Sequence, residues 1–151
     1  RLSEVLSLTL DRVDLARGSL LVVGKGEKER EVYMRKTLRK EMSRWLKTRG
    51  FHPYEDRVFI TRDGRPLKKR HVQQILRRLA GKAGIEGVRC SPHTLRHTFA
   101  TNFIRNGGDA FTLQRILGHA SIETCMVYVH MSGKHVREAM LRFSPVDRME
   151  R

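Results

Sequence analysis

The sequence has few acidic residues, few cysteines and no long apolar run. Its 151 residues include 16 Asp and Glu against 31 Lys and Arg, which gives a formal net charge of +15 at pH 7. A positive field of that size attracts polyanions, so nucleic acid is the first partner that the composition indicates. The chain also lacks an acidic cluster that could hold a metal ion, and no carboxylate-bound metal centre is expected.

The cysteine count and the hydropathy pattern indicate the cellular compartment. Cys90 and Cys125 are too few for a disulfide framework, and they favour a reducing compartment over secretion. The longest aliphatic run, residues 20–23, is far too short to span a membrane, and the N-terminal residues lack the apolar stretch of a signal peptide. We therefore expect a cytoplasmic protein with no membrane partner, built as one domain over residues 1–151.

The first part of the chain predicts short helices and a small sheet. Apolar residues recur at helical spacing within residues 2–8, and again within 38–46 up to a stop at Gly50. Strands are expected at residues 19–23 and 30–34, joined by a turn whose glycines permit positive φ. A further short strand at 58–61 should run into a turn at Asp63 and Gly64. These elements predict a small antiparallel sheet of three strands.

The rest of the chain predicts helices. Residues 72–83 have helical periodicity, with a basic side opposite an apolar one. The next helix should begin with Ser91 as its N-cap and Pro92 as its first residue, and end at Gly107–Gly108. We expect its buried stripe to consist of Leu95, Phe99 and Phe103. Later helix starts are indicated at Asp109, Ser121 and Ser132, the last opening a helix over 133–143.

Basic residues are concentrated between positions 62 and 89. This segment has nine Lys or Arg against only Asp63 and Glu86, a net +7. A basic stripe of this kind is typical of a surface that follows a phosphate backbone. The residues expected to contact DNA are Arg65, Lys68, Lys69, Arg70, Arg77 and Arg78.

Six residues from distant parts of the chain form a set suited to phosphoryl transfer. They are Arg1, Lys25, His93, Arg96, His119 and Tyr128. Such a set suits attack of a tyrosine on a phosphodiester, with fixed cations stabilising the charge on the phosphoryl oxygens. His93 and Arg96 are three apart near a helix N-terminus, so both can reach one phosphate. Taken singly, each member is also compatible with a structural role, and the joint pattern carries the hypothesis.

The motifs around these residues resemble one known family. Arg1-Leu2-Ser3-Glu4 resembles the first arginine box of the tyrosine recombinase, or phage integrase, family. Residues 24–30 are similar to its β-hairpin lysine, residues 92–101 to its second box, and residues 117–119 with 128–130 to its third box and nucleophile. The match covers essentially the whole chain. The resemblance implies an α+β catalytic-domain fold that is mostly helical, with a small three-stranded antiparallel sheet near the N-terminus.

The resemblance also implies a role for each residue of the set. Tyr128 would form a 3′-phosphotyrosyl link, with Arg1, Arg96 and His119 stabilising the transition state. His93 would assist proton transfer and Lys25 would act as the general acid. His97 and His130 are interpreted as structural or supporting residues. No metal, nucleotide or other cofactor is implied.

The resemblance implies partners and a larger protein. The expected partner is double-stranded DNA, with a homotetramer assembled on it, whereas the isolated chain is expected to be monomeric. The helix over 133–143 is expected to dock onto a neighbouring protomer. Family members carry an N-terminal core-binding domain and a short lead before the first arginine, so the chain is interpreted as a truncated catalytic domain. Cys125 stands where small hydroxyl residues are common in the family.

Three other functions fit part of the pattern. A type IB topoisomerase uses a similar set, but tends to have lysine at the position of His93. A metal-dependent nuclease is suggested by His93 and His97, which have the spacing of two zinc ligands on a helix, although Thr94 stands in place of the glutamate usual in such motifs. A non-catalytic DNA-binding module is the third, and the intact set of reactive side chains argues against it.

Overall fold

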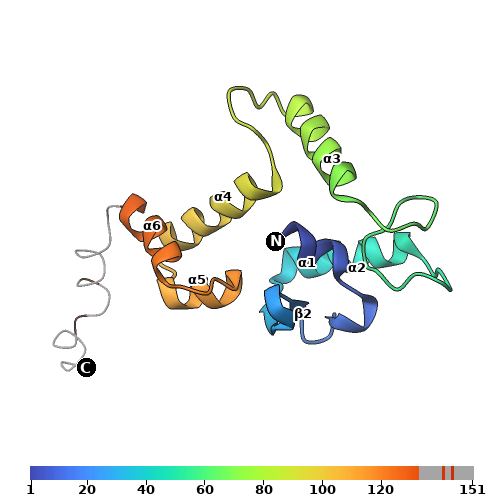
Figure 1. Ribbon diagram of the computed structural model, residues 1–151, viewed down its shortest axis with the longest axis horizontal. Helices are drawn as coiled ribbons and strands as arrows, with labels where there is room; N and C mark the ends of the chain where they lie inside the picture. The colour runs from blue at the N-terminus through green and yellow to red at the C-terminus, as the bar shows by residue number, and fades with distance from the viewer. Residues whose placement is uncertain (133–140, 142–143, 145–151) are drawn as a thin grey trace. The chain divides into compact units, whose positions relative to one another are not determined.

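The computed structural model describes residues 1–132, 141 and 144, and the helix expected over 133–143 lies, apart from Leu141, outside them. The chain forms two compact units, Arg1–Arg96 and His97–Arg151. None of the helices in the described part is long and apolar enough to cross a membrane. The elements in chain order (Figure 1) are α1 Leu2–Ser7, η1 Leu10–Arg12, β1 Val13–Asp14, β2 Ser19–Val23, η2 Lys25–Glu27, β3 Glu29–Tyr33, α2 Lys36–Arg49, α3 Lys69–Lys82, α4 Pro92–Arg105, α5 Ala110–Leu117 and α6 Glu123–Ser132.

The sheet of the first unit has three antiparallel strands in the order β1-β2-β3. Leu20 of β2 pairs with Val13 of β1 on one side and with Val32 of β3 on the other. The strand number and the hairpin β2–β3 are confirmed, and β3 begins one residue earlier than predicted. The mostly helical α+β fold expected from the sequence is therefore confirmed.

The strand predicted at residues 58–61 is wrong, and β1 is the third strand instead. The segment forms only isolated bridges, between Thr9 and Arg57 and between Ile60 and Pro66. Its backbone is bonded to other partners: the Val58 amide donates to Leu8, and the Val58 carbonyl accepts from the indole of Trp45 at 2.8 Å. Because a side chain takes a place that a strand would need, no ladder extends along this segment.

The core of the first unit is built around the sheet and α2. Its buried residues are Leu8, Val22, Met34, Met42 and Val58. Helix α3 forms as predicted, but no residue of this cluster comes from it. Ile75 and Leu79, on the apolar side of α3, are therefore 39% and 51% exposed.

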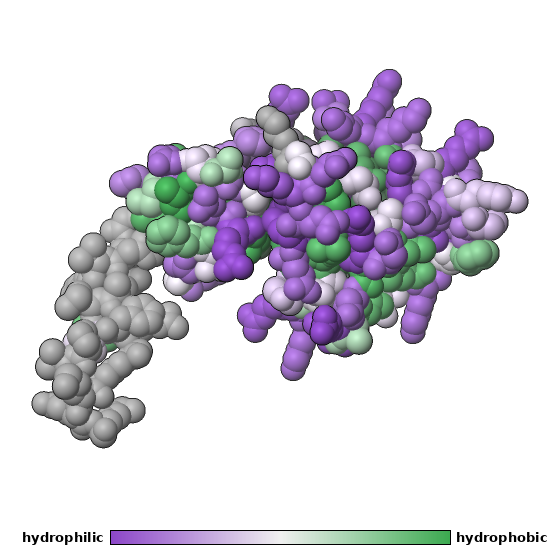
Figure 2. All heavy atoms as spheres, turned by 60° about the horizontal axis from the view of Figure 1, so that its bottom comes forward, coloured by the Kyte–Doolittle hydropathy of each residue, from purple (hydrophilic) through white to green (hydrophobic). Residues whose placement is uncertain are grey.

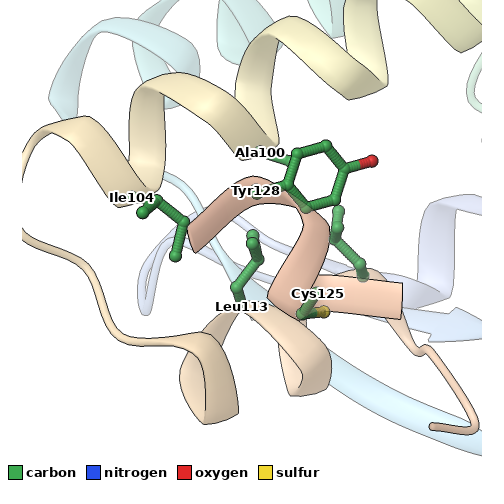
Figure 3. Packing of buried hydrophobic residues seen from close by; sticks show 6 residues of the cluster. Ala100, Ile104, Leu113, Cys125 and Tyr128 are labelled. Carbon is green, nitrogen blue, oxygen red and sulfur yellow. The ribbon is translucent and has the colours of Figure 1, made fainter. Parts of the chain in front are cut away.

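The core of the second unit joins α4, α5 and α6. It consists of Ala100, Ile104, Leu113, Leu117, Cys125 and Tyr128, which Figure 3 shows gathered between the three helices. The predicted stripe of α4 is corrected: Leu95 and Phe99 are about half exposed, and Phe103 is only partly buried. Ala100 and Ile104 face the cluster instead. The small side chain of Ala100 lets α4 approach Tyr128 closely.

Candidate active site

The first candidate arginine lies in a three-residue charge cluster. The guanidinium of Arg1 donates from Nη1 to Oε1 of Glu4 at 2.9 Å. Arg30, on β3, donates to both carboxylate oxygens of Glu4, at 3.1 and 2.7 Å. Glu4 is only 6% exposed, so one buried carboxylate holds two arginines that are 29 residues apart. A two-pronged bond of this kind fixes direction as well as distance.

The carboxylate of Glu4 is held in its charged form. Burial by itself would raise the pKa of Glu4, but hydrogen bonds from Arg30, from the amino group of residue 1 and from Arg1 outweigh it and lower the pKa to about 2. In the 151-residue chain the group is therefore ionised at neutral pH. Its negative charge balances part of the strong positive charge that surrounds it.

The hairpin that carries Lys25 is anchored beside this cluster. Its base is closed by a hydrogen bond of 2.8 Å from the Gly24 amide to the Lys28 carbonyl. A Cβ at Gly24 would lie 3.3 Å from Nη1 of Arg30 and 3.7 Å from Oε1 of Glu4, so a larger residue would crowd the pair. Gly26 has a φ of 72°, the conformation that the glycine-rich turn predicted. Lys25 is the first residue of the tip, η2.

The second candidate box lies at the start of α4. Ser91 caps the helix, since its Oγ accepts a hydrogen bond from the Thr94 amide at 3.2 Å, as predicted. The Thr94 hydroxyl in turn donates to the Arg89 carbonyl at 2.7 Å. His93 and Arg96 are three residues apart in the first turns of α4, with His93 exposed and Arg96 half-buried. They therefore share one helix side near the amide-rich N-terminus.

The candidate nucleophile is buried against the second half of α4. Tyr128 on α6 is 5% exposed, and its hydroxyl lies 3.0 Å from Nδ1 of His97. The two rings are tilted by 58° with centroids 5.5 Å apart. In Figure 3 the phenol oxygen points away from Ile104, at the edge of the cluster. The supporting role expected for His97 thus has a defined contact, although nothing in the sequence indicated that the contact is with Tyr128.

Replacing His97 by alanine should lower the free energy of unfolding by about 1–2 kcal/mol, because the hydrogen bond to the buried Tyr128 hydroxyl and the ring contact are lost. Chemical denaturation of the purified variant measures the change. His130→Ala is the matched control: His130, like His97, is exposed, but its side chain has no hydrogen bond or ring contact among the described residues, so its removal should cost no more than about 0.5 kcal/mol. Equal effects of the two changes would contradict the importance of the His97 contact.

The third candidate histidine is held by the turn after α5 and by Cys125. Gly118 caps α5 in the left-handed conformation, with φ 62° and ψ 44°, and turns the chain at His119. The His119 backbone is fixed on both sides by Gln114, whose carbonyl accepts from the His119 amide and whose side-chain amide donates to the His119 carbonyl at 3.2 Å. Nδ1 of His119 lies 3.2 Å from Sγ of Cys125, which is completely buried.

Each unit therefore contains part of the predicted set, and the described contacts hold its members through residues outside the set. In the first unit Glu4 ties Arg1 to the strand that follows the Lys25 hairpin. In the second unit Tyr128 and the partner of His119, Cys125, lie in one buried cluster. Glu4 and Arg30 were not singled out as site residues from the sequence, although both stand inside the quoted motifs. Among the described residues there is no group of three or more His, Cys, Asp or Glu placed to hold a metal ion.

The six residues expected to contact DNA are all exposed. Arg65 follows the turn at Gly64, Lys68 caps α3, and the others lie along that helix. In residues 1–132 none of the six side chains forms an ion pair with an acidic residue. Figure 2 shows hydrophilic side chains over most of the visible face, with hydrophobic residues between them. These cations are therefore available to a polyanion at no cost in broken ion pairs.

Comparison with known proteins places the chain in a family. The model of the phage integrase family matches residues 1–135. The chain belongs to the phage integrase family. Among its relatives within that family, tyrosine recombinase XerC of Alcanivorax borkumensis is 39% identical over 141 residues, which are 91% of this chain and 46% of that protein.

Two solved structures of the family have the same fold. The crystal structure of XerA recombinase aligns with a TM-score of 0.81 at 35% identity, covering 96% of this chain and 53% of that one. XerH site-specific recombinase, bound to palindromic difH substrate in a post-cleavage complex, aligns with a TM-score of 0.78 at 30% identity, covering 92% of this chain and 40% of that one. The catalytic-domain fold expected from the motifs is confirmed. This member of the phage integrase family spans about half the length of these relatives.

Proposed function

We propose that this chain is the catalytic part of a longer site-specific DNA recombinase, which cuts and rejoins strands through a 3′-phosphotyrosyl intermediate. One observation carries the proposal: all six candidate catalytic residues stand, in the family's order, within the matched stretch 1–135. The relatives reported above are named recombinases, so the topoisomerase alternative is not favoured.

The proposed reaction begins with Tyr128. Its phenolic oxygen bonds to the scissile phosphorus while the bond from phosphorus to the 5′ oxygen breaks, which leaves the 3′ phosphate joined to the tyrosine. The phenolic proton passes toward His93, and Lys25 protonates the departing 5′ oxygen. One phosphate ester is exchanged for another of similar energy. A 5′ hydroxyl from a different strand can therefore reverse the step and join a new partner without ATP.

Three cationic or donor side chains are proposed to stabilise the transition state. Arg1 and Arg96 each present a planar guanidinium that can bond two phosphoryl oxygens and stays charged at any working pH. His119 donates a further hydrogen bond to the same oxygens. Because negative charge grows on these oxygens as the phenol attacks, donors fixed beforehand lower the barrier more than they strengthen substrate binding. The Glu4 contact fixes Arg1 in this way.

The described position of Tyr128 is proposed to be a resting one. Its hydroxyl is bonded to His97, and the residue is 5% exposed within the cluster of the second unit. The hydroxyl has to leave this hydrogen bond before it can attack a phosphodiester, so the turn of α6 that carries Tyr128 is proposed to shift first. Tyr128 must also lose its proton, which costs about 4 kcal/mol at neutral pH for a reference pKa of about 10.

Double-stranded DNA is the proposed substrate, and the basic side of α3 is proposed to follow its backbone. The exposed cations Arg70, Arg77 and Arg78 lie on one side of this helix, at spacings of seven and eight residues. The XerH relative is bound to DNA in its solved complex. Exchange between two duplexes needs four strand cuts, and each cut uses one tyrosine. We therefore propose a homotetramer as the working assembly of the longer protein.

Neutralising Arg77 and Arg78 together, as Arg77→Gln and Arg78→Gln, should weaken DNA binding by on the order of tenfold and flatten its salt dependence, because fewer counterions are released. Titration of a labelled duplex at several salt concentrations measures both. The matched control is Lys40→Gln with Lys47→Gln, the same charge change on two exposed residues of α2. If the control pair weakens binding as much, net charge and not the α3 surface accounts for the affinity.

The decisive experiment for the proposed function is covalent trapping. The longer protein is incubated in EDTA with a nicked duplex bearing its target site, so that the freed strand diffuses away and the phosphotyrosyl adduct accumulates. We expect a denaturation-resistant protein–DNA species, and peptide mapping should place the DNA on Tyr128. The absence of an adduct, or one that needs a metal ion, would be incompatible with the proposed chemistry.

A further inference from the structure

The contact between His119 and Cys125 bears on how His119 works. The two atoms concerned, Nδ1 and Sγ, lie 3.2 Å apart. Cys125 is completely buried, among residues that include Leu113 and Tyr128. In that apolar setting the neutral thiol is favoured over the thiolate, because a thiolate would lose its hydration. The sulfur therefore carries a proton that it can donate.

The tautomer of His119 follows from the direction of this hydrogen bond. A neutral imidazole has one N–H donor and one acceptor nitrogen, and the partner of one nitrogen decides the state of the other. If the thiol donates to Nδ1, the ring proton resides on Nε2. Nε2 can then donate to a phosphoryl oxygen, whereas the opposite tautomer would present a lone pair to an anion.

We propose that Cys125 is a positioning residue for His119: its thiol donates to Nδ1 and so keeps Nε2–H directed at the scissile phosphate. This inference rests on the proposed function, in which His119 stabilises the transition state. Cys125 does not touch the substrate. It acts through His119, in the way that outer partners fix the tautomer and orientation of metal-bound histidines.

The same contact links His119 to the helix of the nucleophile. Cys125 and Tyr128 are three residues apart on α6, so both point from one side of the helix into one buried cluster. The orientation of His119 is thus set by the helix that carries Tyr128. A movement of that turn of α6 would shift the hydrogen-bond partner of His119 together with the nucleophile.

A matched pair of substitutions separates the hydrogen bond from packing. Cys125→Thr and Cys125→Val are alike in shape and branching, but only threonine has a hydroxyl that can donate to Nδ1. We expect Cys125→Thr to keep the rate of adduct formation within about threefold of the parent, and Cys125→Val to lower it by on the order of ten- to a hundredfold. If valine is tolerated as well as threonine, Cys125 contributes packing only and the proposal is overturned.

A second measurement is independent of activity. In the 151-residue chain, long-range ¹H–¹⁵N spectra of the imidazole rings, assigned by comparison with His119→Gln, report which nitrogen carries the proton. We expect the Nε2–H tautomer in the parent and in Cys125→Thr, and an altered Nδ1 signal in Cys125→Val. A proton on Nδ1 in the parent would overturn the inference. Failure of the covalent trapping with Tyr128 would instead remove the proposed function and leave this spectroscopic result standing.

Discussion

Replacing Tyr128 by phenylalanine should abolish the covalent adduct with a nicked duplex while DNA binding stays unchanged. The phenolic oxygen is the atom that bonds to phosphorus in the proposed reaction, and phenylalanine lacks only that atom. The ring stays in the cluster with Ala100 and Leu113, so the fold is kept. The loss of the hydrogen bond to His97 should cost about 1 kcal/mol of stability. Electrophoresis of labelled DNA under denaturing conditions measures the adduct.

The chain supplies its own controls for this experiment. It has three tyrosines, and the other two, Tyr33 and Tyr54, are 74% and 100% exposed. Tyr33→Phe and Tyr54→Phe make the same chemical change at positions outside the motifs, and both should form the adduct at the parental rate. An adduct that survives in Tyr128→Phe, or that disappears in either control, would assign the nucleophile elsewhere.

Replacing Glu4 by glutamine should have the second largest effect, on stability and on cleavage together. The change removes the charge that Arg1 and Arg30 share at a site that is 6% exposed. Breaking such a cluster should lower the free energy of unfolding by about 2–4 kcal/mol. Arg1 would no longer be held in one direction, so cleavage should fall by on the order of a hundredfold, comparable to the loss of a single donor to a developing anion.

The pH dependence of stability identifies the origin of this effect. The pKa of Glu4 is about 2 in the folded chain against its ordinary 4.5. A lowered folded pKa means that the unfolded chain takes up the proton first, so the contribution of Glu4 is fully present above pH 4.5 and is lost as the pH falls toward 2. Denaturant titrations of parent and Glu4→Gln should therefore differ most above pH 4.5 and converge below it.

Glu41→Gln is the matched control for the Glu4 variant. Glu41 also pairs with an arginine, Arg44, but both side chains are more than half exposed. Exposed pairs contribute little, so this change should cost less than about 1 kcal/mol and leave cleavage unaffected. A difference between parent and Glu4→Gln that persists unchanged down to pH 2 would show that shape, and not charge, accounts for the loss.

The parts of the fold that sequence predicts well are those with local causes. The hairpin between β2 and β3 follows from glycines at its turn, and the start of α4 from the capping residue Ser91. The strand prediction at residues 58–61 failed because their apolar run fits a strand, whereas the Val58 amide donates to the Leu8 carbonyl and the Val58 carbonyl accepts from the Trp45 indole. The burial of Ala100 rather than Phe99 likewise depends on which helices approach α4, and periodicity alone does not encode that.

The residues of the candidate site were likewise predictable from the sequence only in part. Motif spacing was enough to select Arg1, Arg96 and Tyr128 as candidates, because reactive side chains of a family stand at fixed offsets. Their partners were not predictable: a carboxylate three residues from Arg1 could pair along the helix, but Arg30 reaches it from strand β3. In a chain with 31 basic residues, no sequence signal singles out that arginine. Contacts between distant segments are set by the three-dimensional fold, which motif spacing does not encode.

The closed base of the β2–β3 hairpin limits how far Lys25, the proposed general acid, can move. Only the residues between Gly24 and Lys28 lie beyond the hydrogen bond of 2.8 Å that joins these two residues. A tip of three residues spans at most roughly 10 Å when extended. In the proposed mechanism, proton delivery by Lys25 is therefore short-range, and the scissile phosphate has to be brought close to the tip of this hairpin.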